Sequence, residues 1–260
     1  MKIVVLAKQV PDTWSDRKID LESGMLDRAA SEPVPDEINE RALENALLFK
    51  DANKDAEIVV AVMGPEDATK TLRKLLSMGA DSAVLVSDAA LAGSDMVQTA
   101  RVLAATIEKI GGVDLVVAGN EATDGRGGMI PAMVAEILGL PVLPGLDSIE
   151  IAADKVSGTA GVDGGSLQVS SSLPAVVSVT EKTAEPRFPN FKGIMAAKKK
   201  PLESWSLADL GIQAGPEAAS VRSVMVSAVA RPPKQAGPKV ADDGTAAAQL
   251  AEFLAANRLI

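Results

Sequence analysis

The chain has 260 residues, a formal net charge of −9 and 47% hydrophobic residues, enough for one large domain with an appendage or for two small domains. It contains no histidine, cysteine or tyrosine, which excludes Ser-His-Asp and Cys-His nucleophiles, disulfides, and metal sites built on histidine or thiolate. Four phenylalanines and two tryptophans are too few for base stacking, and the acidic balance disfavours nucleic acid as a partner. We therefore expect small-molecule binding or protein docking, with no catalytic residues and no metal.

No apolar run reaches the roughly 18 residues that a transmembrane helix requires. The apolar start at Lys2–Ala7 is also too short for a signal peptide. We expect a cytoplasmic protein without membrane insertion.

The first 140 residues alternate short apolar runs with amphipathic helical patterns. The runs predict buried strands at Lys2–Ala7, Glu57–Val62, Ala83–Val86 and Val113–Ala118, and the patterns predict helices at Glu37–Lys50, Glu66–Met78, Ser94–Ile110 and from about Met129. This alternation predicts an α/β fold with a mainly parallel, doubly wound sheet and helices on both faces.

Between Leu146 and Val179 the helical patterns stop and Gly-rich turns separate the apolar runs. Four strands are predicted here, at Ser148–Ala153, Lys155–Val162, Ser166–Ser171 and Ala175–Val179. We expect them to form an antiparallel extension at the edge of the parallel sheet.

The C-terminal part is a Pro/Gly-rich linker at 230–244 followed by an Ala/Leu-rich helix at 245–260. A helix on a long tether cannot pack against its own linker, so we expect this arm to dock elsewhere. The alternative is a helix that returns to its own domain. We divide the chain into an α/β domain, 1–203, and a C-terminal segment, 204–260.

A Gly-rich turn, GNEATDGRGG at Gly119–Gly128, follows the strand at Val113–Ala118 and precedes a helix. Ligands of open parallel sheets bind at the carboxyl ends of strands near the switch point. Glycines let backbone N–H groups approach a phosphate, and a helix N-terminus adds partial positive charge. The turn is neither GxGxxG nor a Walker A loop, so by itself it leaves nucleotide binding open.

The segment Val179–Pro201 combines exposed-looking apolar residues with positive charge. Its apolar residues are Phe188, Phe191, Ile194 and Met195, and three lysines follow at Lys198–Lys200. Three prolines and a glycine deny it a long helix. Six basic against three acidic residues between Glu181 and Glu203 give a local balance of +3. The segment is typical of a docking loop; the alternative is a solvated charge run beside a buried turn.

The same segment resembles the beta subunit of electron transfer flavoproteins. The resemblance rests on motifs that occur in the family's order: KIVVLAKQVPD at Lys2–Asp12, LSMGAD at Leu76–Asp81, AGNEATDG at Ala118–Gly125, EKxxEPR at Glu181–Arg187 and GIMAAKKK at Gly193–Lys200. It covers residues 1 to 203 well and the remainder loosely.

The resemblance implies an adenine nucleotide alpha hydrolase-like fold and an electron carrier without substrate turnover of its own. In that family a heterodimer holds FAD mainly in the alpha subunit, while the beta subunit walls one side of the flavin and binds a structural AMP. Electrons come from acyl-CoA or other flavin dehydrogenases and go to a membrane-linked acceptor.

By position, the resemblance implies AMP contacts from the ends of two strands, from the start of the first helix and from the Gly-rich turn. These residues are Leu6, Ala7, Asp36, Met63, Gly119, Asn120, Glu121, Ala122, Thr123, Asp124, Gly125, Arg126, Gly127 and Gly128. Asp36 also suits a helix N-cap. The family's frequent DGDTGQ form is one residue shorter here and lacks its threonine, and we hypothesise that Arg126 replaces that hydroxyl at the phosphate.

The resemblance also implies that Phe188–Ala197 is the loop that recognises dehydrogenases, with Phe191 as its apolar anchor beside Phe188, Ile194 and Met195. Glu185 and Arg187 are candidates for bracing this loop internally. The C-terminal helix would join the alpha subunit.

Three alternatives stay open. The same fold serves nucleotide hydrolases and ligases, for which Asp124 and Lys8 are available, and shorter stress-type nucleotide-binding regulators. Within the family, some relatives carry a second FAD in place of AMP and bifurcate electrons.

Overall fold

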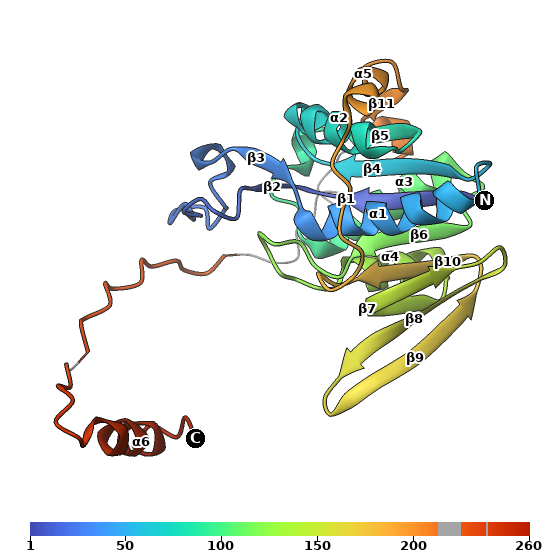
Figure 1. The fold of residues 1–260 in the computed structure, drawn as a ribbon. Coiled ribbons are helices and arrows are strands. Elements are labelled where there is room, and N and C mark those ends of the chain that lie inside the picture. Colours follow the sequence, from blue (N-terminus) through green and yellow to red (C-terminus); the bar gives the residue numbers. More distant parts are fainter. Residues whose placement is uncertain (213–224, 238) are drawn as a thin grey trace. The chain divides into compact units, whose positions relative to one another are not determined.

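The computed structural model describes residues 1–212, 225–237 and 239–260 (Figure 1). The chain divides into two compact units, Met1–Val226 and Ser227–Ile260. Residues 213–224 and 238, which belong to the predicted C-terminal segment and its linker, lie outside the described residues. The boundary predicted after residue 203 falls inside a strand, β11 (Leu202–Trp205).

The first unit is built on a nine-stranded sheet with the order β11-β5-β4-β1-β6-β10-β7-β8-β9. Seven of these strands are parallel: β11, β5 (Ser82–Val86), β4 (Glu57–Met63), β1 (Lys2–Ala7), β6 (Leu115–Gly119), β10 (Ala175–Val179) and β7 (Val142–Ile151). Two antiparallel strands, β8 (Lys155–Val162) and β9 (Gly165–Ser172), extend the sheet beyond β7. The predicted α/β fold with an antiparallel edge is confirmed.

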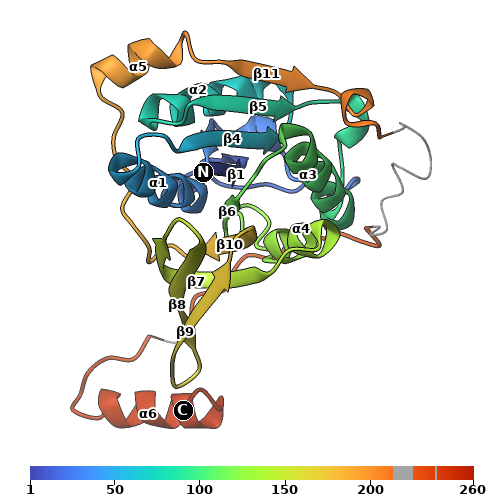
Figure 2. The same ribbon diagram turned by 90° about the vertical axis from the view of Figure 1, so that its right-hand side faces the viewer.

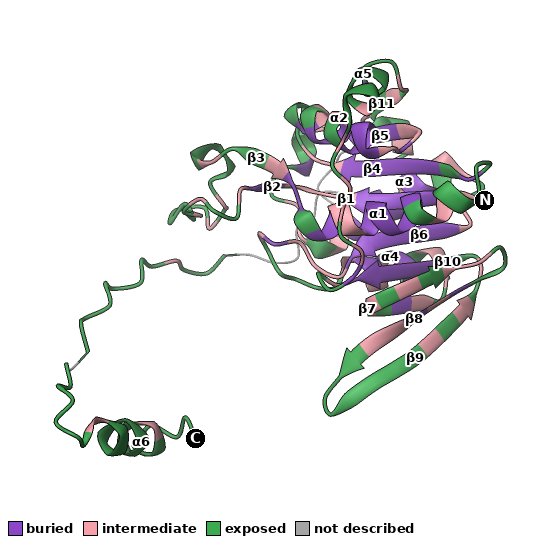
Figure 3. Ribbon diagram, in the orientation of Figure 1, coloured by how far each residue is buried: buried purple, intermediate pink, exposed green. Residues whose placement is uncertain are grey.

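Two pairs of helices cover the parallel part of the sheet, one pair on each face (Figure 2). Helices α1 (Glu37–Ala52) and α2 (Thr69–Met78) share one apolar core with the sheet, and α3 (Met96–Ile110) and α4 (Ile130–Leu138) share the other. Alternate side chains of a strand point to opposite faces. Ile3 and Val5 of β1 therefore enter the first core, and Val4 and Leu6 enter the second. Burial on both faces explains why the central strands are continuous apolar runs (Figure 3).

The structure corrects the predicted position of β10. We expected Ala175–Val179 to belong to the antiparallel extension, but β10 lies between β6 and β7 and runs parallel to both. All five of its residues are buried, as a position inside a parallel sheet requires. The prediction was wrong because the strand follows the β8–β9 hairpin in the chain and was grouped with it.

Several short elements were not predicted. They are β2 (Gln9–Pro11) and β3 (Pro33–Pro35), which pair antiparallel, the strand β11, the 3-10 turns η1 (Arg28–Ala30), η3 (Ala89–Leu91) and η4 (Ala208–Leu210), and the helix α5 (Phe191–Ala197). The predicted docking loop thus contains a seven-residue helix, which is consistent with its having no long one. The predicted helix Glu66–Met78 begins with a 3-10 turn, η2 (Glu66–Ala68), and continues as α2.

The segment between β10 and α5 crosses α1 and is fixed to it by polar contacts (Figure 1). Glu44 of α1 is 4% exposed and accepts hydrogen bonds from the Nε and Nη2 atoms of Arg187, both at 2.8 Å. Arg187 also donates to Asp51 at 2.8 Å. These hydrogen bonds, from Glu44 first, raise the pKa of the Arg187 guanidinium although its burial acts the other way. Glu185 pairs with Arg41 at 3.0 Å, so both charged residues of the EPR motif brace this segment.

The second unit contains one helix, α6 (Ala246–Ala256), within the predicted range 245–260. None of its side chains is buried, and Leu250 and Phe253 are 58% and 52% exposed. In the part of the chain that the structure describes, we find no helix with the length and apolar character to span a membrane.

Arg187→Ala should lower the free energy of unfolding by about 2 kcal/mol, because it leaves the Glu44 carboxylate buried without its charged partner. Chemical denaturation measures this change. Lys182→Ala is the matched control, since Lys182 pairs with Asp147 at the surface, where an ion pair contributes below about 1 kcal/mol. Equal, small effects of both variants would show that the Arg187 contacts do not stabilise the fold.

Candidate functional site

The predicted nucleotide site lies at the carboxyl ends of β1, β4 and β6. From β1 the sheet continues through β4 and β5 on one side and through β6 and β10 on the other, so the switch point lies between β1 and β6. Leu6 pairs with Ala61 of β4 and with Ala118 of β6. The strand-end residues Leu6, Ala7, Met63 and Gly119 therefore lie along one edge of the sheet, where ligands of such folds bind.

Asp36 is fully buried and joins the first helix to the Gly-rich turn. Its Oδ1 accepts from the backbone N–H of Ile38 at 3.0 Å, as an N-cap of α1. Its Oδ2 accepts from the backbone N–H and the hydroxyl of Thr123, at 2.6 and 2.8 Å. The expected N-cap is present, and the other carboxylate oxygen binds the Gly-rich turn, so both oxygens of Asp36 have partners within the protein.

The start of the turn packs against the first turn of α1. A Cβ atom on Gly119 would come within 2.5 Å of Asn39 Nδ2, so only glycine fits there without a shift. The next residue, Asn120, has a buried Oδ1 atom with no hydrogen-bond partner in the described structure. A buried acceptor without a partner is costly, and a donor group on a ligand would satisfy it.

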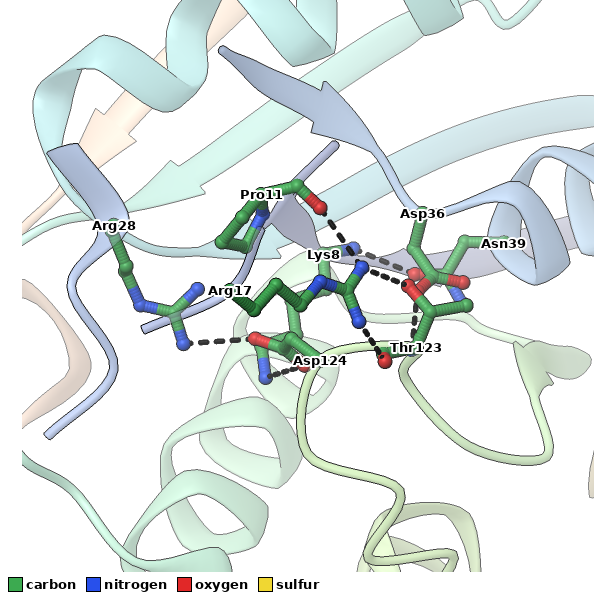
Figure 4. A network of polar contacts seen from close by, with 8 residues as sticks. All are labelled: Lys8, Pro11, Arg17, Arg28, Asp36, Asn39, Thr123 and Asp124. Atoms are coloured by element: carbon green, nitrogen blue, oxygen red, sulfur yellow. Dashed lines mark hydrogen bonds and ion pairs between the residues drawn. The ribbon is translucent and has the colours of Figure 1, made fainter. Parts of the chain in front are cut away.

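Asp124 lies beneath two cations (Figure 4). Its side chain is 1% exposed, and its two oxygens accept from Lys8 Nζ at 2.8 Å and from Arg28 Nη2 at 2.9 Å. Burial acts to raise the pKa of this carboxyl, but the hydrogen bonds and charges of Lys8 and Arg28 outweigh it and hold the pKa below its usual value. Asp124 is therefore ionised at neutral pH.

A second arginine comes from the same excursion between β2 and β3 as Arg28. Arg17 donates to the carbonyl oxygen of Thr123, to the Thr123 hydroxyl at 3.3 Å and to the carbonyl oxygen of Pro11 at 2.9 Å (Figure 4). Sequence reasoning missed both arginines, because residues 12–32 show no periodic pattern that would place them. One feature of the sequence could have indicated them. Arg17 and Arg28 lie between two proline-containing segments, Gln9–Pro11 and Pro33–Pro35, in the connection from β1 to α1.

The tip of the turn carries Arg126 in the left-handed region, with φ +49°. Its Nη1 donates to Glu121 at 3.1 Å and its side chain is 72% exposed. Contact with a phosphate would therefore require this guanidinium to exchange Glu121 for the ligand. Gly127 packs against Met96, and Gly128, at φ +65°, leads into α4, whose N-terminus has no side-chain cap.

These features suit a ligand that carries both a hydrogen-bond donor and an anionic group. Asn120 offers an unsatisfied acceptor, and Lys8 and Arg28 supply positive charge beside the turn. The remaining predicted residues, Ala122 and Gly125, lie in the same turn. Within the described residues, no three acidic side chains gather as a metal site would require.

The predicted partner surface lies on and before α5. Phe188 and Phe191 are 95% and 80% exposed, and Ile194 and Met195 are about half exposed. Exposed aromatics of this size are uncommon on a monomer surface and mark contact sites.

The helix α5 is mounted on α2. Arg73 donates to the carbonyl oxygens of Ala197 and Lys200 at 2.7 and 2.8 Å, and Lys200 Nζ donates to those of Leu76 and Ala80 at 3.0 and 2.6 Å. Burial lowers the pKa of Lys200. Of the lysine run, only Lys198 and Lys199 are exposed, so Lys200 does not contribute to the predicted cationic surface.

Comparison with known proteins identifies the family. The family model of the electron transfer flavoprotein domain matches residues 24–210. The electron transfer flavoprotein subunits beta of Mycobacterium bovis and Mycobacterium leprae are each 46% identical over 263 aligned residues, covering 99% of both chains. The caffeyl-CoA reductase-Etf complex subunit CarD of Acetobacterium woodii is 37% identical, covering 86% of this chain and 84% of that relative.

The similarity to beta subunits extends over 99% of the chain. The Gly-rich turn follows β6, and the EPR-to-lysine segment connects β10 with β11. The chain belongs to the electron transfer flavoprotein family, as a beta subunit.

Proposed function

We propose that this chain forms a heterodimer with an alpha subunit and walls one side of an FAD that the alpha subunit mainly holds. In this function the flavin accepts electrons from acyl-CoA or other flavin dehydrogenases and passes them to a membrane-linked acceptor. The protein is an electron carrier in the cytoplasm, and the redox chemistry belongs to the cofactor. The beta subunit supplies binding surfaces and a nucleotide site.

The observation that carries the proposal is the exposure of Phe191 on a rigidly mounted helix. Asn190 caps α5 by accepting from the N–H of Gly193 at 2.8 Å, and a Cβ on Gly193 would collide with the carbonyl oxygen of Ser77 in α2. The helix therefore sits directly on the α2 backbone while Phe191 stays 80% exposed. A few aromatic anchors supply most of the affinity of an interface, and a fixed anchor loses little conformational entropy on binding.

We propose AMP as the structural ligand at the carboxyl ends of β1, β4 and β6. Asp36, Thr123 and the glycines of the turn shape this site, and Asn120 provides an acceptor for a donor on the ligand. The second candidate is a second FAD in place of AMP. The similarity to a subunit of the caffeyl-CoA reductase-Etf complex favours keeping this candidate.

We propose that α6 docks on the alpha subunit. Its apolar side chains, Leu250 and Phe253 among them, remain exposed within its own unit, and a helix with an uncovered apolar face requires a partner.

Phe191→Ala should slow flavin reduction by a partner dehydrogenase about tenfold or more, because it removes the exposed anchor of the complex. Stopped-flow reduction of the co-purified heterodimer measures this rate, and its absorbance measures the FAD content, which should not change. The control is Leu48→Ala, which truncates a 51% exposed side chain on α1. Equal reduction rates in the Phe191 variant and the parent would contradict the proposal that Phe191 docks on the dehydrogenase.

Arg126→Ala should reduce the nucleotide that co-purifies with the heterodimer, if its guanidinium leaves Glu121 to bind the phosphate. Chromatography of the nucleotides released by denaturation measures the amount and identifies AMP or FAD. One FAD and one AMP per heterodimer support the proposal, and two FAD support the second candidate. An unchanged nucleotide content in the variant would show that Arg126 does not hold the phosphate.

Removal of residues 245–260 should weaken association with the alpha subunit without unfolding the first unit, since α6 belongs to a separate compact unit. Sedimentation of the two subunits together measures their association, and circular dichroism checks the fold. Undiminished association would contradict docking of α6 on the alpha subunit.

A further inference from the structure

Two cations at the nucleotide site are gathered by one buried carboxylate. Lys8 follows β1, and Arg28 begins the turn η1 in the excursion between β2 and β3. They reach the two oxygens of Asp124 at 2.8 and 2.9 Å. Because Asp124 is 1% exposed while Lys8 and Arg28 are 41% and 49% exposed, the cations lie between the carboxylate and solvent. An anion that approaches this place meets positive charge first.

Both cations have N–H donors that make no hydrogen bond in the described part of the chain. A guanidinium has five N–H donors and an ammonium has three. Among the described residues, Asp124 is the one polar partner of the Lys8 ammonium and of the Arg28 guanidinium. The three groups together carry a net charge of +1, from two cations and one carboxylate.

The position of Lys8 and Arg28 beside the Gly-rich turn indicates which class of anion they bind. Asp124 belongs to the turn that follows β6 at the carboxyl edge of the sheet, and Asn120 of the same turn has an unsatisfied acceptor. The third nearby cation, Arg17, is already bound to the backbone at Thr123 and Pro11. Arg17 also keeps an unpaired Nε donor, but that atom is buried. Lys8 and Arg28 are 41% and 49% exposed and are therefore the cations that a ligand can reach.

We propose that Lys8 and Arg28 bind the phosphate group of the nucleotide, and that Asp124 is the counter-charge that holds them in position. Asp124 is not itself a ligand, because it is covered and ionised. Phosphate oxygens accept from guanidinium in the same forked geometry as a carboxylate does. The inference rests on the nucleotide site proposed above and names the side chains that read its phosphate.

The test compares AMP with adenosine, which differ only in the phosphate. Calorimetry of the full chain with its alpha subunit, stripped of bound nucleotide, should show a preference for AMP. Arg28→Gln should weaken AMP binding about tenfold or more, the loss of one charge-assisted contact, and leave adenosine binding within about twofold. Lys8→Met should behave in the same way, and Arg28→Lys should restore part of the preference.

Arg101→Gln is the matched control for the change in net charge, because Arg101 is exposed on α3; it should keep the parent's preference for AMP. The double variant Arg28→Gln with Asp124→Asn has the parent's charge of +1 at the site but lacks the guanidinium. It should stay weak for AMP, and recovery to the parent's affinity would overturn direct contact.

The outcomes separate the two proposals. A parent protein that binds neither AMP nor adenosine overturns the nucleotide site and this inference with it. A parent that prefers AMP, together with an Arg28→Gln variant that keeps the same preference and the same melting curve, overturns this inference alone.

Discussion

Helix α1 and its N-cap bury four polar side chains, and the need to satisfy them fixes the Gly-rich turn and the segment that leads to α5. Asp36, Asn39, Glu44 and Asn45 are each at most 7% exposed. A buried polar group without a partner costs about 1–3 kcal/mol, and a buried charge costs more. The partners come from far along the chain, so the helix forces distant segments together.

The polar side chains at the N-terminal end of α1 hold the residues of the proposed nucleotide site. Asp36 binds Thr123 of the Gly-rich turn, and Asn39 Oδ1 accepts from the N–H of Lys8 at 2.8 Å. Further along, Glu44 binds Arg187, and Asn45 shares hydrogen bonds with Thr183 at 3.0 and 3.2 Å. Helix α1 therefore positions both the Gly-rich turn at the switch point and the segment between β10 and α5.

The sequence predicted what depends on local pattern and missed what depends on distant partners. The strand Lys2–Ala7 has the predicted bounds because its apolar run is buried on both faces of the sheet. Lys155–Val162 has only two buried residues, and its end was predicted from the turn at Gly164–Gly165 that follows it. The burial of Glu44 and Asn45 was not predicted, since their partners lie about 140 residues away. Lys200 read as part of a cationic run, yet the carbonyl oxygens at the end of α2 bind it.

The contrast between the exposed aromatics and the contacts beneath them has a physical reason. Phe188 and Phe191 follow the segment that Arg187 ties to Glu44 of α1. The helix α5 is held to α2 by hydrogen bonds of Arg73 and Lys200. The proposed encounters with dehydrogenases are transient, and a transient complex does not rely on a large interface. Fixing the backbone in advance lowers the entropy lost at each encounter, so a small patch suffices for recognition. Phe191 is 80% exposed in the free subunit, as an anchor that a partner is to cover on binding must be.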